Sequence, residues 1–137
     1  MNLDSGKGVS YNLDTRIYGA SSFKGIYAAY LSEHLADGEV GLSSSAISLM
    51  DASVRYSDNT AFSTLRNSYD GAGFAGWIES CGVNSDIVND THFPRYSARE
   101  SALLWFHTYQ YLQTGTEAAN RLRELFTQQT FLSFVRE

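Results

Sequence analysis

Two short segments contain residue types that could carry out acyl transfer on a serine. In the first segment Ser21 is followed three residues later by Lys24, and the second segment reads Ser57-Asp58-Asn59. A serine hydroxyl is a weak nucleophile and needs an adjacent base. A desolvated lysine can lose its proton near neutral pH and can then accept one from a serine. The two segments therefore predict nucleophilic catalysis with Ser21 as the nucleophile and Lys24 as its base.

The spacing of these residues fits that chemistry. Residues three apart lie on one face of a helix, so we expect Lys24 to reach the hydroxyl of Ser21. A serine at a helix start also has unpaired backbone N–H groups beside it, which can hold the oxyanion of a tetrahedral intermediate. We expect Ser57 to pass a proton to the leaving nitrogen and Asn59 to hydrogen-bond a substrate amide. The Ser21 and Ser57 hydroxyls should then lie within about 6 Å of each other, in direct or one-water contact.

Hydrophobic periodicity predicts that helices position both segments. The helices are expected over residues 21–35, 45–54, 58–70, 73–80 and 98–114, with a last one from Thr116 onward and a loop over 83–96. Ser97 and Glu100 form a capping-box pattern at the start of the long helix, which we expect to be buried on most sides. Residues 8–18 are expected to be a short extended piece without a partner strand, because apolar and polar residues alternate there.

Each candidate residue also has a purely structural interpretation. Ser21 could be a helix cap, Lys24 a solvated surface lysine, and Asp58 the cap of its own helix, a role that we expect whatever the function. The three histidines lie far apart in the sequence, so we expect no metal site and no cofactor. Cys81 is the only cysteine, which excludes an internal disulfide and is consistent with a small buried residue.

Composition limits the classes of protein to which the chain can belong. Of its 137 residues, 43% are hydrophobic and 18% are charged, as in an ordinary globular domain. The formal net charge of -5 argues against a nucleic-acid surface, which is usually built from clustered Lys and Arg. No apolar run approaches the roughly 20 residues of a membrane span. The first residues lack the basic-then-apolar pattern of a signal peptide.

The residues around the two segments resemble class A β-lactamases and the related penicillin-binding proteins. Ser-x-x-Lys and Ser-Asp-Asn belong to the motif set of that group. Tyr56-Ser57-Asp58-Asn59-Thr60-Ala61 is similar to the corresponding family segment without a mismatch. Tyr11-Asn12-Leu13-Asp14 followed by Ala20-Ser21-Ser22-Phe23-Lys24 resembles the strand, turn and nucleophile helix of the family. Tyr96-Ser97-Ala98-Arg99-Glu100 is similar to the start of the helix that follows the omega loop.

The chain also departs from the class A pattern. Ser57 follows Ser21 by 36 residues, a shorter interval than is usual in that family. The loop between Gly82 and Ser97 is short and lacks Glu-x-x-Leu-Asn, whose glutamate activates the deacylating water. Neither Asp86 nor Asp90 in this loop is assigned that role. No Lys-Thr-Gly follows the last predicted helix, so the strand that binds the substrate carboxylate is not expected in these residues.

The resemblance implies a mainly α fold. Residues 1–137 would form a single helical domain of the β-lactamase and transpeptidase-like fold, with the flanking α/β sheet portion missing or very reduced. It implies an acyl-enzyme on Ser21 with β-lactams or peptidoglycan peptides, catalysed by Ser21, Lys24 and Ser57, with Asn59 binding substrate. The alternatives are a non-catalytic binding or scaffold domain, an inactive fragment, and an unrelated helical bundle. An extracytoplasmic location is implied, and an uncovered face would favour self-association or pairing with a sheet segment.

Overall fold

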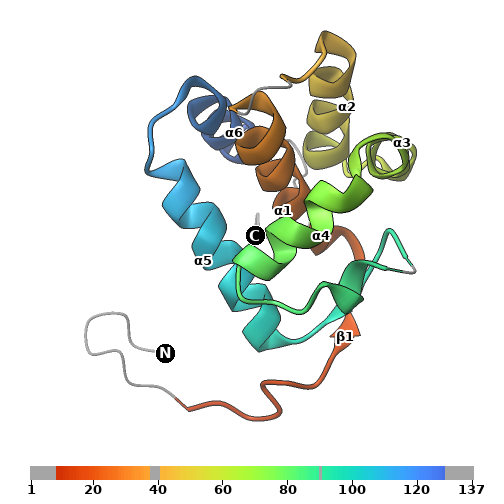
Figure 1. The fold of residues 1–137 in the computed structure, drawn as a ribbon, viewed down its shortest axis with the longest axis vertical. Coiled ribbons are helices and arrows are strands. Elements are labelled where there is room, and N and C mark those ends of the chain that lie inside the picture. Colours follow the sequence, from red (N-terminus) through yellow and green to blue (C-terminus); the bar gives the residue numbers. More distant parts are fainter. Residues whose placement is uncertain (1–8, 38–40, 90, 129–137) are drawn as a thin grey trace, which may run out of the picture.

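The computed structural model describes residues 9–37, 41–89 and 91–128, and this part of the chain is mainly helical, as expected (Figure 1). The six α-helices are α1 (Phe23–Tyr30), α2 (Ser44–Arg55), α3 (Asn59–Tyr69), α4 (Gly71–Ser80), α5 (Ala98–Leu112) and α6 (Glu117–Thr127). Shorter helical turns are η1 (Ala20–Ser22), the π-helical turn η2 (Leu31–Ala36) and η3 (Ser85–Val88). Strands β1 (Ile17–Tyr18) and β2 (Arg95–Tyr96) pair antiparallel, with Ile17 opposite Tyr96.

Helix α1 is the centre of the hydrophobic core, and the other helices pack around it (Figure 1). Phe23, Ile26 and Tyr27 are at most 1% exposed. The ring of Tyr27 packs at right angles against Phe62 of α3 and Phe74 of α4, while α1 also contacts α2, α5 and α6. Since Lys24 lies in its first turn, this buried helix gives the candidate site a rigid support.

Capping residues set the starts of the helices, as the sequence predicts. The Asp58 carboxylate accepts hydrogen bonds from the backbone N–H groups of Thr60 and Ala61, so its expected role as a cap is confirmed. Ser97 and Glu100 form the complete capping box of α5, with each side chain accepting from the other's backbone N–H. These caps fix the positions at which α3 and α5 begin, next to the segments that carry the candidate site.

Helix α5 is less buried than its sequence suggests. Leu104, Thr108 and Tyr111 are buried, whereas Phe106 and Tyr109 are 59% and 60% exposed. The prediction of a helix buried on most sides is therefore wrong. The apolar residues that fill its remaining circumference form an exposed face, which no other described element covers completely.

The N-terminal extended piece is also shorter than expected, and it does have a partner. Val9 and Tyr11 are exposed, and only Ile17 and Tyr18 form a strand. The pairing with β2 could not be predicted, because it depends on the path of the chain between the two strands. A strand of two residues is also too short to show a periodic pattern. Residue 8 lies outside the described residues. Within the described ranges, none of the helices has both the length and the apolar character needed to span a bilayer.

Candidate active site

Ser21 lies in the tight turn η1, which leads directly into α1. The backbone N–H of Gly19 donates to the carbonyl of Pro94 at 3.1 Å, which ties this turn to the segment before β2. Ala20 has a positive φ of 47°, a left-handed conformation that is uncommon for alanine. Ser21 is exposed, and neither η1 nor α1 has a side-chain cap. The interpretation of Ser21 as a helix cap is therefore wrong.

The adjacent Ser22 is held within the turn. Its hydroxyl donates to the carbonyl of Gly19 at 2.5 Å and is in hydrogen-bond contact with the hydroxyl of Tyr96. The backbone N–H of Ser22 donates to the same carbonyl of Gly19 at 3.1 Å. This N–H group is therefore not free to hold an oxyanion. The contact between Tyr96 and Ser22 was not predicted, because it depends on the β1–β2 pairing.

Lys24 is buried and fully hydrogen-bonded. Lys24 is only 3% exposed, so its interpretation as a solvated surface lysine is wrong. The ammonium donates to the backbone carbonyl of Ser57 at 2.5 Å, to the Ser57 hydroxyl at 3.1 Å and to Oδ1 of Asn59 at 2.6 Å. An ammonium has three hydrogens, and these three acceptors use all of them.

The environment of Lys24 favours loss of its proton. Burial lowers its pKa from 10.5, and the negative charge of Asp58 opposes this shift only in part. The centroids of the Phe62 and Phe93 rings each lie 5.9 Å from the ammonium, and these cation–π contacts favour its charged form, so burial is the cause of the lowered pKa. A lysine with a lowered pKa can act as a base closer to neutral pH than a solvated one.

The Ser-Asp-Asn segment forms the turn between α2 and α3. Ser57 has a positive φ of 55°, so this residue adopts a left-handed conformation that a non-glycine residue rarely takes. Strained backbone of this kind is often found at functional sites. The conformation allows both the carbonyl and the hydroxyl of Ser57 to face Lys24, while Asp58 caps the next helix.

A continuous set of hydrogen bonds joins the four residues that the sequence singles out. The Ser57 hydroxyl donates to the Ser21 hydroxyl at 3.0 Å, well within the expected 6 Å. Among the described residues, no hydrogen bond joins Lys24 directly to Ser21, so the expected direct contact is replaced by one through Ser57. The three hydrogens of the Lys24 ammonium are directed at Ser57 and Asn59, and the Ser57 hydroxyl lies between the ammonium and Ser21.

A pocket of about 480 Å³ opens beside Ser21. Its polar part consists of Ser21, Ser22, Lys24, Ser53 and Ser57, and its apolar part consists mainly of Val54, Trp105 and Phe126. No carboxylate lines this pocket in the described part of the chain. The sequence did not indicate Trp105 and Phe126 as site residues, because both occupy positions that look like ordinary helix core.

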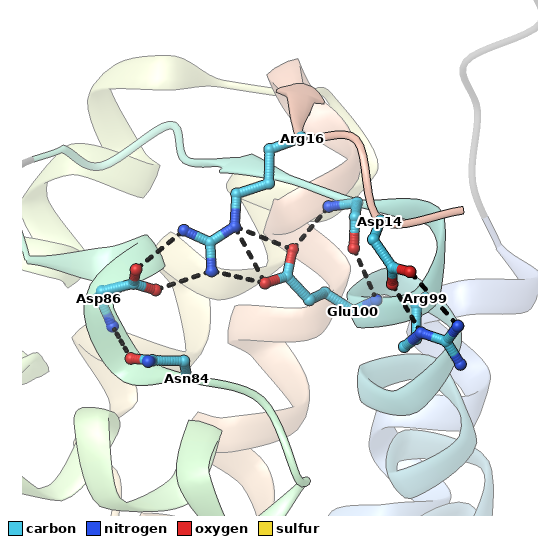
Figure 2. Close-up of polar contacts among 7 residues, drawn as sticks. Asp14, Arg16, Asn84, Asp86, Arg99 and Glu100 are labelled. Carbon is cyan, nitrogen blue, oxygen red and sulfur yellow. Dashed lines mark hydrogen bonds and ion pairs between the residues drawn. The ribbon is translucent and has the colours of Figure 1, made fainter. Parts of the chain in front are cut away.

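Arg16 stabilises the segment that leads into the Ser21 turn, as Figure 2 shows. Its guanidinium donates to both carboxylate oxygens of Asp86, at 2.9 and 2.8 Å, and to Glu100, at 2.6 to 3.2 Å. The clamp joins three regions: the segment that precedes β1, the turn η3, and the capping box of α5. Asp86 therefore has a structural partner, and Asp90 lies outside the described residues.

Arg66 holds the loop between α4 and β2 from the inside. Its buried guanidinium pairs with Asp70 at 2.7 Å and donates to the carbonyls of Val88, Thr91 and His92 at 3.0 to 3.5 Å. The same loop carries Phe93, which packs against Phe62 and Lys24. Arg66 thus helps to place one of the rings that shield the lysine.

The described residues contain no group of three or more His, Cys, Asp or Glu side chains that could hold a metal ion. Comparisons of the chain with protein-family models, with curated proteins and with solved structures found no match.

Proposed function

We propose that this chain is the helical part of a serine acyl-transferase or hydrolase of the class A β-lactamase and penicillin-binding kind. The hydrogen-bonded series from Ser21 through Ser57 to Lys24 and Asn59 is the observation that carries this proposal. Four residues from two segments that are 36 positions apart form one network beside a pocket. The mainly α architecture supports the assignment to a β-lactamase-like helical domain.

The proposed reaction begins with Lys24 in its neutral form. The proton of Ser21 moves to Ser57 as the proton of Ser57 moves to Lys24, and the Ser21 oxygen attacks the carbonyl carbon of an amide or β-lactam. The hydroxyl hydrogens reorient for this step, as hydroxyl rotors can. The carbon–nitrogen bond then breaks, and the leaving nitrogen takes a proton from Ser57, which Lys24 replaces. The product is an acyl-enzyme on Ser21, and Lys24 is neutral again.

Hydrolysis of that acyl-enzyme is proposed to be slow. Deacylation requires a base that activates water, and no carboxylate lines the described pocket. This favours a penicillin-binding enzyme, a peptidase or a slow hydrolase over an efficient β-lactamase. On the basis of the family resemblance, we also propose an extracytoplasmic location and a β-lactam or peptidoglycan-peptide substrate.

Covalent labelling with a fluorescent penicillin tests the proposal directly. The wild-type chain should gain the mass of one penicillin, and Ser21→Ala should gain none. Ser48→Ala is the matched control, since Ser48 is an exposed serine of α2 whose hydroxyl donates to the carbonyl of Ser44 and which does not line the pocket. The proposal fails if the wild-type chain takes up no label, or if Ser21→Ala is labelled as well as the wild type.

The alternative of a non-catalytic binding domain predicts a different result. Reversible binding of the penicillin without a mass change would favour it, and the same hydrogen-bond network would then have only a structural role.

A further inference from the structure

The pocket beside Ser21 has two chemically different walls. The polar wall consists of Ser21, Ser22, Lys24, Ser53 and Ser57, and the aromatic wall consists of Trp105 of α5 and Phe126 of α6. The two aromatic rings pack against each other with centroids 5.8 Å apart, at an angle of 57°. Trp105 is 38% exposed, so part of the indole remains accessible.

Gly25 allows the aromatic wall to approach the nucleophile helix. A Cβ atom at this position would lie 2.8 Å from Cη2 of Trp105 and 3.5 Å from Cε1 of Phe126. The first distance is shorter than real Cβ contacts allow, so the indole rests directly on the backbone of α1 one residue after Lys24. Only glycine permits this contact without a shift of Trp105.

The charges of the pocket favour an uncharged group at this wall. Lys24 is the only charged residue among its described lining residues, and its three hydrogens are already in hydrogen bonds. When an apolar group of a ligand is transferred from water to this wall, the binding free energy becomes more favourable in proportion to the apolar area that is buried. An aromatic group gains more, because it can also stack on the indole.

We propose that Trp105 and Phe126 form the subsite for the acyl side chain and select an apolar, preferably aromatic, group attached next to the scissile carbonyl. This inference rests on the proposed function, because it takes Ser21 as the acylated residue. The wall should favour longer acyl chains by about fourfold for each buried methylene group.

Acylation by p-nitrophenyl esters measures this selectivity. The substrates are the acetate, butyrate, hexanoate and phenylacetate esters, and the quantity compared is the ratio of each acylation rate to that of the acetate. The wild type should favour phenylacetate over acetate by at least tenfold, and Trp105→Ala should lose most of that ratio. Gly25→Ala should also reduce it, because the added methyl group displaces the indole.

Phe106→Ala is the matched control. Phe106 follows Trp105 on the same helix and is also aromatic, but it is 59% exposed and does not line the pocket. Its variant should keep the wild-type ratio. A wild-type protein that is acylated without preference among the esters overturns the subsite, as does an equal loss of preference in Phe106→Ala.

A binding experiment separates this inference from the proposed function. In the Ser21→Ala variant, the indole N–H signal of Trp105 is followed by NMR during titration with N-benzylacetamide, with N-methylacetamide as the control. The Trp105 signal should shift with the benzyl compound only, while the signal of the buried Trp77 should not move. No shift of the Trp105 signal overturns the aromatic subsite, whether or not Ser21 is acylated. A shift without any acylation of the wild type rejects the proposed function and leaves the aromatic binding wall in place.

Discussion

The hydroxyl of Ser57 lies 3.0 Å from the hydroxyl of Ser21, although the two residues belong to different turns. One turn precedes the central helix α1, and the other joins α2 to α3. Both turns contain a residue with positive φ, Ala20 in the first and Ser57 itself in the second. The contact between the hydroxyls therefore depends on two unusual backbone conformations, which the packed helices around them maintain.

Replacing Ser57 separates strain from catalysis. Ser57→Ala removes the hydroxyl but keeps a side chain at a φ of 55°, whereas Ser57→Gly removes the hydroxyl and relieves the strain. We expect the glycine variant to be more stable than the alanine variant by about 1 kcal/mol in urea denaturation, after allowance for the backbone entropy of glycine. Both variants should lose penicillin labelling by about 10²-fold or more, the usual contribution of a proton-transfer group. Equal stability of the two variants contradicts the strain argument, and wild-type labelling by either removes Ser57 from the mechanism.

Lys24 should make both stability and acylation depend on pH. Its pKa is lowered from 10.5 by burial, so the unfolded chain binds this proton more tightly than the folded one. Below the folded pKa the folded protein carries the full cost of a buried charge, and this cost is relieved as the pH rises from that value to 10.5. We therefore expect the stability of the wild type relative to Lys24→Met to rise with pH in that window, in urea denaturation from pH 7 to 10. A constant difference between the two proteins contradicts the lowered pKa.

Acylation provides an independent measurement of the same group. If Lys24 is the base, the labelling rate should rise with pH until Lys24 is deprotonated and then level off. Lys24→Arg should abolish labelling, because arginine stays protonated in proteins and does not reproduce the geometry of lysine. Labelling by Lys24→Arg at the wild-type rate would show that another group takes the proton.

The sequence predicts the helices and the main residues of the site because both depend on local patterns. The spacing of Ser97 and Glu100 alone predicts the start of α5, and Asp58 as a capping residue predicts the start of α3. The site residues can be predicted for the same reason, because their residue types occur at fixed short intervals within two segments. These residues are Ser21, Lys24, Ser57 and Asn59.

The remaining features depend on contacts between distant segments. Tyr96 contacts Ser22 because β2 pairs with β1. Trp105 lies against α1 because Gly25 has no side chain in the space that the indole occupies. The exposed face of α5 could not be predicted either, because apolar residues all around a helix normally indicate a buried one. The route from Lys24 to Ser21 was missed because it runs through Ser57, which is distant from both residues in the sequence.

Arg66 should matter far more for stability than a surface arginine in the same helical arrangement. It pairs with Asp70 four residues later, and its side chain is completely buried. Arg66→Met leaves Asp70 and the loop carbonyls without their donor, and we expect a loss of about 3 kcal/mol in urea denaturation. Arg121 pairs with Glu117 at the same spacing on an exposed face, so Arg121→Ala should cost at most about 0.5 kcal/mol. Similar losses in the two variants would contradict the loop-anchoring role of Arg66.

The clamp of Arg16 on Glu100 and Asp86 should control stability at acid pH. Burial alone would raise the pKa of Glu100, but the hydrogen bonds from Arg16 and Ser97 outweigh it and hold the pKa below 4.5. The pKa of Asp86 is likewise held below 3.8, chiefly by its hydrogen bonds with Arg16. A carboxylate with a lowered pKa stabilises the folded state above its unfolded pKa, and this contribution is lost as the pH falls through the folded value.

The wild type should therefore lose stability below pH 4.5. Arg16→Gln should be less stable than the wild type at pH 7 and should show a shallower decline of stability in acid. Both are measured by urea denaturation at intervals from pH 7 to 3. Arg99→Gln is the matched control, because Arg99 bonds to the exposed Asp14, where solvent screens the charges, and it should change the acid profile much less. Parallel profiles for the wild type and Arg16→Gln would show that the clamp does not couple these carboxylates to folding.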